Sequence, residues 1–204
     1  ISPCGPSCGS VMCNESAIAV NPKNIKHQVV ATNVKHMFWS RNGGKKYKHR
    51  RMSSSHGVYG DPVLLYDDQE SVYYAHLSHD KTKKWPDIFD KIVVQKSTRN
   101  GRAWSDGAGI GKNGKMQDKP WLSFDANPTS KGYGNLYLTW TEFDKYESKN
   151  PLDSSRILFS MSKDRGQDFS TPVQINDKNG DCLDGDNTVE GATTCAGPHG
   201  ELWA

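Results

Sequence analysis

The sequence lacks any long hydrophobic run, and only 34% of its 204 residues are hydrophobic. Without an apolar stretch of bilayer length, a transmembrane helix is excluded. Nineteen glycines and ten prolines leave little room for long helices. Six tryptophans, eight tyrosines and six phenylalanines nevertheless supply apolar surface for a core. The length and composition therefore predict one folded domain without membrane spans.

The sequence also lacks a strong excess of charge of one sign. The chain contains twenty-six Lys and Arg and twenty-three Asp and Glu, which gives a net charge of +3, and both signs are scattered along the chain. This balance gives no support for a nucleic-acid partner. The Lys-rich run 45–51 is interpreted as an exposed strand whose charges oppose edge pairing, with polyanion binding as the alternative.

The chain does not begin with Met, and its first residues do not show a signal-peptide pattern. We expect an exported protein, secreted, periplasmic or on the cell surface, whose signal peptide is absent from this sequence. Residues 1–15 form a leader with three cysteines, Cys4, Cys8 and Cys13. Two more cysteines flank an acidic loop, and we predict a disulfide between Cys182 and Cys195 that would contribute roughly 3 kcal/mol.

An eight-residue pattern of serine, polar turn residue, glycine and aromatic residue occurs three times, at 40–47, 97–104 and 162–169. Serine and Asp or Asn side chains can bond backbone amides across a tight bend, and glycine tolerates a positive φ. A strand-like run precedes each copy, so each is predicted to be a hairpin turn. The turn residues are Ser40, Asn42, Gly44, Tyr47, Ser97, Gly101, Trp104, Ser162, Asp164, Gly166 and Phe169.

A second repeat joins an acidic or glycine start to a proline, a short apolar strand, an Asp-containing turn and an aromatic strand. It occurs at 60–75 and 118–140, and a third start appears at 189–192. Units of four short strands at this period are typical of β-propeller blades. We therefore predict an all-β propeller of four-stranded antiparallel blades, with about three blades and a stub between residues 16 and 204. Further blades, from the same or a second chain, would close the ring.

The turn pattern resembles the Asp box, the repeat of bacterial neuraminidases and other sialidase-type propellers. Residues 162–169 match it fully, whereas Asn42 and Arg99 replace the aspartate in the other copies. The resemblance implies a six-bladed ring, with the boxes on its rim, and exo-glycoside hydrolysis by three arginines, a Tyr nucleophile, a Glu base and an Asp acid. In the segment nearest the motif of the first arginine, Gly60 stands where the arginine is expected. This departure weakens the assignment as an enzyme.

The residues that open the inner strands should converge near the propeller axis. They include Asp61, Asp118, Lys119 and Glu190. The carboxylates could bind a cation, accept hydrogen bonds from sugar hydroxyls, act as an acid–base pair, or only cap strand ends. Tyr59, two residues before Asp61, belongs to the predicted ligand set. Glu142 also belongs to it, because residues 141–147 mix carboxylates with aromatic residues in what we expect to be a long loop on the ligand face.

The loop with Asp181, Asp184 and Asp186 offers several oxygen ligands at short spacing, so calcium is the possible cofactor, although the loop departs from the EF-hand pattern. Together these features predict a propeller that binds or hydrolyses extracellular glycans or glycoproteins. The alternative is a non-catalytic adhesin or scaffold that binds protein or polysaccharide.

Overall fold

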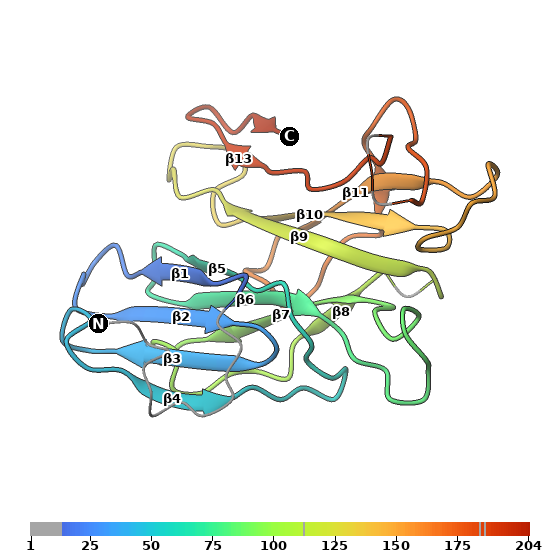
Figure 1. Cartoon of the computed structure of the whole chain (residues 1–204). Helices are drawn as coiled ribbons and strands as arrows, with labels where there is room; N and C mark the ends of the chain where they lie inside the picture. Colours follow the sequence, from blue (N-terminus) through green and yellow to red (C-terminus); the bar gives the residue numbers. More distant parts are fainter. Residues whose placement is uncertain (1–13, 112, 184, 186) are drawn as a thin grey trace.

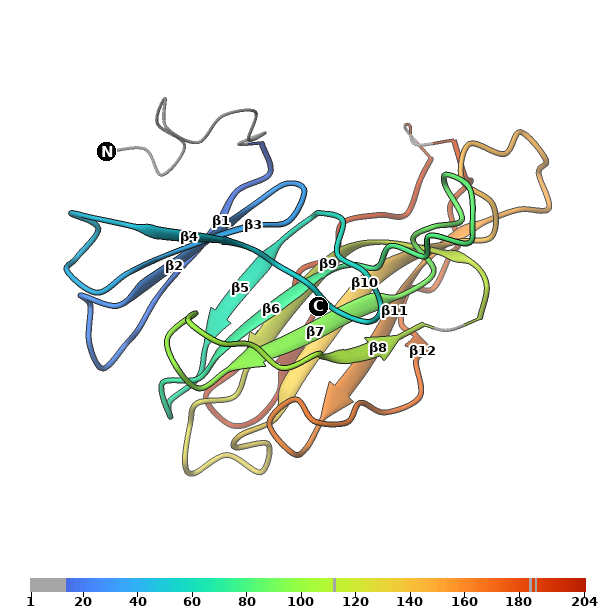
Figure 2. The ribbon, with the colours of Figure 1, turned by 90° about the horizontal axis from the view of Figure 1, so that it is seen from below.

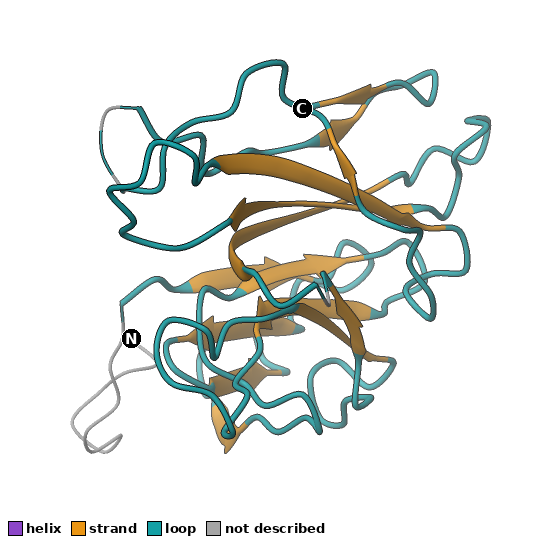
Figure 3. Ribbon diagram, turned by 90° about the vertical axis from the view of Figure 1, so that its right-hand side faces the viewer, coloured by secondary structure: helices purple, strands orange, loops and turns teal. Residues whose placement is uncertain are grey.

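The computed structural model describes residues 14–111, 113–183, 185 and 187–204. Every regular element among these residues is a β-strand, as Figures 1 and 3 show. No described segment forms a helix long and apolar enough to cross a bilayer. The predicted all-β class is confirmed.

The strands form three four-stranded sheets and one two-stranded sheet. The first sheet contains β1 (Ala17–Val20), β2 (Gln28–Thr32), β3 (His36–Ser40) and β4 (Lys48–Arg51). The second contains β5 (Val63–Tyr66), β6 (Val72–Leu77), β7 (Ile92–Ser97) and β8 (Ala108–Ile110). The third contains β9 (Met116–Phe124), β10 (Leu136–Phe143), β11 (Ser155–Ser162) and β12 (Val173–Gln174), and the last pairs β13 (Cys195–Ala196) with β14 (Leu202–Trp203).

Each four-stranded sheet is an antiparallel meander in which neighbours in sequence are neighbours in space. The first strands of successive sheets contact one another, β1 with β5 and β5 with β9. Figure 2 shows the three sheets side by side. This is the arrangement of propeller blades, and the described residues form three blades and part of a fourth.

The blades are held together by the apolar residues that alternate along their strands. Between the first and second blades, Met37 packs with Leu64 and Tyr74 in one buried cluster. Between the second and third blades, Ile92 and Trp140 belong to a larger cluster. Both faces of the middle blade are therefore buried, which explains why every residue of β6 is buried.

The three repeated turns connect the third and fourth strands of their blades. In each turn, the serine hydroxyl accepts the backbone N–H of the glycine four residues later: Gly44 to Ser40 at 3.0 Å, Gly101 to Ser97 at 3.1 Å and Gly166 to Ser162 at 2.7 Å. In the third turn, the Asp164 carboxylate also accepts the N–H groups of Gln167 and Asp168. In the second turn, Arg99 stands where that carboxylate would be, and the serine bond remains.

The predicted disulfide between Cys182 and Cys195 is not formed, and both are free thiols. Cys182 is buried against the third blade, in the cluster that contains Trp140, whereas Cys195 is exposed at the start of β13. The two cysteines belong to different parts of the fold, so their closeness in sequence does not bring them together. The leader cysteines Cys4, Cys8 and Cys13 lie outside the described residues.

Candidate functional site

A left-handed backbone residue occurs just before or within the first strand of each blade. Glu15 (φ 49°) and Asp61 (φ 52°) stand two residues before β1 and β5, and Gly191 (φ 76°) precedes β13. Lys119 (φ 47°) lies at the irregularity in the pairing of β9 with β10. A positive φ is uncommon for residues other than glycine, and such strained positions often cluster at functional sites. Here the strained backbone carries an ionisable side chain at three of the four positions.

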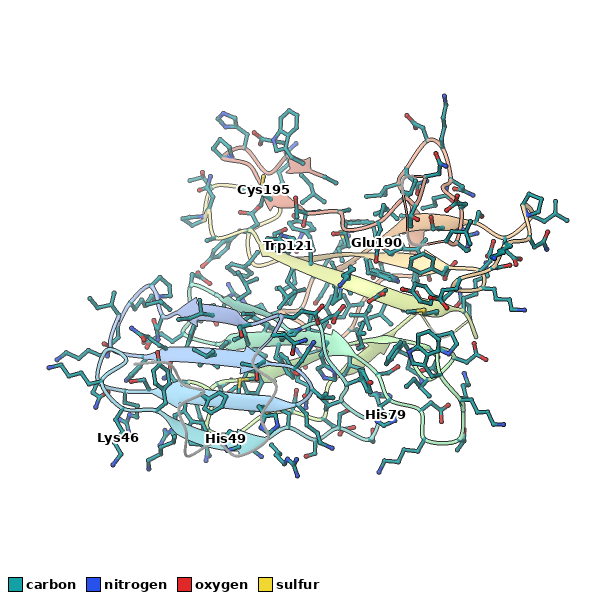
Figure 4. The ribbon with its side chains drawn as sticks, viewed as in Figure 1. Lys46, His49, His79, Trp121, Glu190 and Cys195 are labelled. Carbon is teal, nitrogen blue, oxygen red and sulfur yellow. The ribbon has the colours of Figure 1, made fainter. Side chains whose placement is uncertain are left out.

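These four residues line one pocket of about 320 Å³, which we call the strand-start pocket. Trp121 forms part of its wall, with 41% of its surface exposed, and its indole N–H donates to the carbonyl of Thr194. Trp121 belongs to β9, and Figure 4 shows its place along that strand. The remaining lining residues are Ser16, Pro62, Val63, Pro120, Ala192 and Thr193. The pocket thus combines carboxylates, an ammonium group and an aromatic face.

Asp61 is the most perturbed acid of the pocket. Burial, a hydrogen bond to Glu15 and the nearby charge of Asp118 raise the pKa of Asp61 to about 8. The same hydrogen bond holds the pKa of Glu15 below its ordinary value. At neutral pH, Asp61 therefore keeps its proton while Glu15 is ionised. Environments that push the pKa values of two carboxyl groups apart are characteristic of acid–base pairs.

Lys119 balances this acidic centre. Its Nζ lies 3.4 Å from the Asp61 carboxylate and 3.5 Å from that of Glu15. Burial would lower the pKa of Lys119, but the charges of Asp61 and Asp118 outweigh it and raise that pKa above its ordinary value. Asp118 is only 8% exposed and accepts the backbone N–H of Lys119 at 2.8 Å, while burial raises the pKa of its carboxyl group.

The structure thus brings together Asp61, Asp118 and Lys119, and the charge of Glu190 acts on Asp118. Asp61 and Lys119, which the sequence repeat aligns with one another, share the left-handed backbone conformation. Sequence reasoning missed Glu15, which it assigned to the leader. The signal was the position of Glu15 two residues before the first strand, obscured because Ser16 stands where the later repeats have proline.

Position 60 has no room for a side chain. A Cβ on Gly60 would lie 2.6 Å from Oδ1 of Asn33, the atom that accepts the backbone N–H of Asp61 at 2.9 Å. An arginine there would displace Asn33 and remove this bond. Asn33 thus fixes the backbone of Asp61, and the departure from the sialidase motif has a steric cause in this chain.

Two other predicted ligand residues do not line the strand-start pocket. Tyr59 packs against the core between the second and third blades, with its ring 4.7 Å from that of Phe89. Glu142 is 3% exposed and pairs with Arg156 at 2.7 Å.

Glu142 belongs to a closed polar network. Burial would raise the pKa of Glu142, but hydrogen bonds from Asn113, Gln117 and Arg156 outweigh it and lower that pKa. Arg156 also pairs with Asp144 at 2.6 Å. With its oxygens already bonded, Glu142 is placed to hold the strands together.

The loop that suggested calcium is only partly described, because Asp184 and Asp186 lie outside the described residues. Asp181 accepts the N–H of Leu183 and the hydroxyl of Thr188, which closes a turn. Within the described part of the chain, three or more His, Cys, Asp or Glu side chains are nowhere arranged to hold a metal ion.

A larger hollow of about 490 Å³ lies between the first and second blades. It is lined by residues 52–58 and 79–82 together with Lys35 and Lys91. Its only carboxylate, Asp80, already accepts the N–H and hydroxyl of Thr82. We therefore place the candidate site at the strand-start pocket, where carboxyl groups converge, although this pocket is the smaller one.

Neither the protein-family models nor the curated proteins match the sequence. Solved structures resemble the fold. The GH93 α-L-arabinofuranosidase of Fusarium graminearum, solved with arabinobiose, is 15% identical over 78% of this chain and 47% of its own, with a TM-score of 0.52. A protein of unknown function from Dyadobacter fermentans is 14% identical over 94% of this chain and 62% of its own, with a TM-score of 0.55. An ancestral GH74 enzyme is 18% identical over 78% of this chain and 20% of its own, with a TM-score of 0.50.

The chain spans between a fifth and about three fifths of the length of these structures. At such low identity the likeness concerns the fold alone. The chain therefore has the fold of part of a β-propeller, of the kind found in glycoside hydrolases.

Proposed function

We propose that the chain binds a glycan in the strand-start pocket and that Asp61 and Glu15 act on its glycosidic bond. The observation that carries the proposal is that Asp61 and Glu15 meet in one pocket beside the exposed face of Trp121, where their surroundings raise the pKa of Asp61 and lower that of Glu15. Glycoside hydrolysis needs one carboxylic acid that protonates the leaving oxygen and one carboxylate that activates water or attacks the sugar. The resemblance to enzymes solved with sugars supports a glycan as the ligand.

Each part of the pocket has a role in this proposal. The protonated Asp61 donates its proton to the glycosidic oxygen, and the ionised Glu15 takes a proton from the attacking water. Because the two carboxyl groups of an inverting pair stand about 6.5–9.5 Å apart, sugar binding has to break the hydrogen bond between Asp61 and Glu15 and admit the water between them. Lys119 limits the build-up of negative charge as Asp61 ionises and can donate a hydrogen bond to a sugar hydroxyl. Trp121 offers an apolar face to a sugar ring. Export to an extracellular or periplasmic space and membership of a sialidase-like six-bladed ring belong to the same proposal.

The test compares the chain with Asp61→Asn and Glu15→Gln. Hydrolysis of a panel of nitrophenyl glycosides, including an α-sialoside and an α-L-arabinofuranoside, should fall by about 10²-fold or more in either variant. Asp87→Asn is a matched control, because Asp87 is exposed and outside the pocket. Equal loss in the control, or hydrolysis by Asp61→Asn at the rate of the unmodified chain, would refute the catalytic roles.

A non-catalytic glycan-binding module is the second candidate, and Gly60 favours it because the first arginine of the sialidase motif is missing and cannot be accommodated. In that case the panel is not hydrolysed, but glycans of an array bind, and Trp121→Ala weakens this binding about tenfold or more, as expected for an aromatic residue central to a binding site. Absence of both hydrolysis and binding would exclude a glycan function at this pocket.

A further inference from the structure

The first blade carries an unbalanced positive charge. Residues 16–60 contain nine Lys and Arg and not one Asp or Glu. The rest of the chain contains the other seventeen basic residues and all twenty-three acidic ones, a net charge of −6. The small net charge of the whole chain is therefore the sum of a strongly positive first blade and a negative remainder. This finding corrects the expectation that both signs are scattered along the chain.

Part of this charge surrounds a small pocket at the turn between β3 and β4. The pocket, of about 190 Å³, is lined by Trp39, Arg41, Asn42, Lys46, Lys48 and Arg102. We call this set the basic surface. Its four cations are exposed, and Figure 4 shows Lys46 pointing away from the body of the molecule. The ion pairs of the described residues use other cations, namely Lys83, Lys91, Lys115, Lys119, Arg156 and Arg165.

The backbone beneath the basic surface is held in place. The Asn42 carboxamide oxygen accepts the N–H of Lys46 at 2.9 Å, and the hydroxyl of Ser40 donates to the same oxygen. Arg50 of β4 donates to the carbonyl of Arg102 in the second blade at 3.1 Å. The surface therefore spans two blades whose relative position is fixed by a hydrogen bond, which reduces the ordering cost of binding.

We infer that the basic surface binds a linear acidic polysaccharide that carries sulfate or carboxylate groups. Guanidinium groups can form paired hydrogen bonds with such anions, and ammonium groups attract them as point charges. Single-stranded nucleic acid is disfavoured because its binding uses exposed aromatic residues for base stacking, whereas Trp39, the aromatic residue of the basic surface, is half-buried in β3. The large exposed hydrophobic residues of the first blade are all aliphatic: Ile18, Val20 and Ile25.

The experiment compares two triple variants of equal charge. Arg41→Gln/Lys46→Gln/Lys48→Gln removes exposed cations of the first blade, whereas Lys145→Gln/Lys149→Gln/Lys178→Gln removes exposed cations elsewhere. Neither set has side chains in the ion pairs of the described residues. Binding is measured by calorimetry at several salt concentrations with heparin, polygalacturonate, neutral dextran, single-stranded DNA and duplex DNA.

We expect the chain to bind heparin or polygalacturonate but not dextran. The basic-surface variant should bind at least about tenfold more weakly, and its slope of log affinity against log salt should be shallower by about 2, taking ~0.7 for each of three lost contacts. The control variant should change affinity less than about threefold, because its charges lie away from the bound anion.

Three results would overturn the inference. The first is that neither acidic polysaccharide binds at low salt. The second is that the two triple variants lose the same affinity for the polysaccharide. The third is that either DNA binds more tightly than the polysaccharides and that this DNA binding is lost in the basic-surface variant. The inference is independent of the glycan function proposed above, and Asp61→Asn separates them. Loss of heparin binding in Asp61→Asn would place the anion in the strand-start pocket and refute the basic surface as its site.

Discussion

Replacing Asp61 with asparagine should change the stability of the protein in a pH-dependent way. Relative to the unmodified chain, Asp61→Asn should gain unfolding free energy as the pH rises from acid to neutral. The pKa of Asp61 is raised from 3.8 to about 8 in the folded protein, so the folded state holds a proton that unfolding releases. The stabilisation from this bound proton is fully present below about pH 4 and is lost as the pH rises through 8. Asparagine is neutral at every pH and does not undergo this loss.

The magnitude follows from the size of the shift. Each pKa unit corresponds to 1.36 kcal/mol, so a shift of about four units gives up to about 5 kcal/mol between pH 4 and pH 8. Asp61 is mostly buried, with 15% of its side chain exposed, so solvent screens little of this effect. The pKa of about 8 already includes the effect of Lys119, whose positive charge lowers the pKa of Asp61.

The assay is urea unfolding of both proteins at several pH values from 4 to 8, followed by tryptophan fluorescence. The difference in unfolding free energy should be small at pH 4 and grow steadily in favour of Asp61→Asn, whereas Asp87→Asn should show no such growth. A difference that is constant across this range, or one that grows in favour of the unmodified chain, would refute a protonated Asp61.

Three further predictions test other parts of the structure. Arg156→Ala should destabilise the protein by about 3 kcal/mol in urea unfolding, because it leaves buried Glu142 without its closest cation; a loss below about 0.5 kcal/mol, as for a surface pair, would contradict this. Ser162→Ala should cost about 1–2 kcal/mol by removing the acceptor of the Gly166 N–H, and an unchanged melting temperature would show that the turn does not depend on it. A thiol reagent should label Cys195 in the native protein and Cys182 only after unfolding, and a peptide that links the two in a non-reducing digest would contradict the free thiols.

The sequence was sufficient to predict the blades because their signals are local. The short apolar runs alternate with serine–glycine turns, and the turns recur at a period that fits four strands. Ser162, Asp164 and Gly166 lie within five residues of one another, so a turn that depends on their mutual bonds is visible in the sequence.

The strand-start pocket was only partly predictable because it joins residues far apart in sequence. Asp61 and Lys119 were singled out by their prolines, but Glu15 has no such marker and its role depends on the meeting of three strand starts. Glu142 lies in a buried ion pair outside the strand-start pocket. Its acidic and aromatic neighbours suggested a ligand loop, whereas the partner that neutralises it, Arg156, comes from the next strand.

The disulfide prediction relied on sequence distance, which does not determine distance in the fold. Cys182 is drawn into the core of the third blade by burial, while the chain then runs across that blade to place Cys195 in the next sheet. Gly60 illustrates a different limit. Its lack of a side chain is explained by Asn33, a residue of the preceding blade that no local pattern connects to it.

The most direct test of the account is a crystal structure of the chain soaked with arabinobiose or with the tightest-binding glycan of the array. The account predicts a sugar in the strand-start pocket, with its ring on Trp121 and an oxygen within hydrogen-bond distance of Asp61. Sugar density in the larger hollow beside His79, with the strand-start pocket unoccupied at the same ligand concentration, would contradict it.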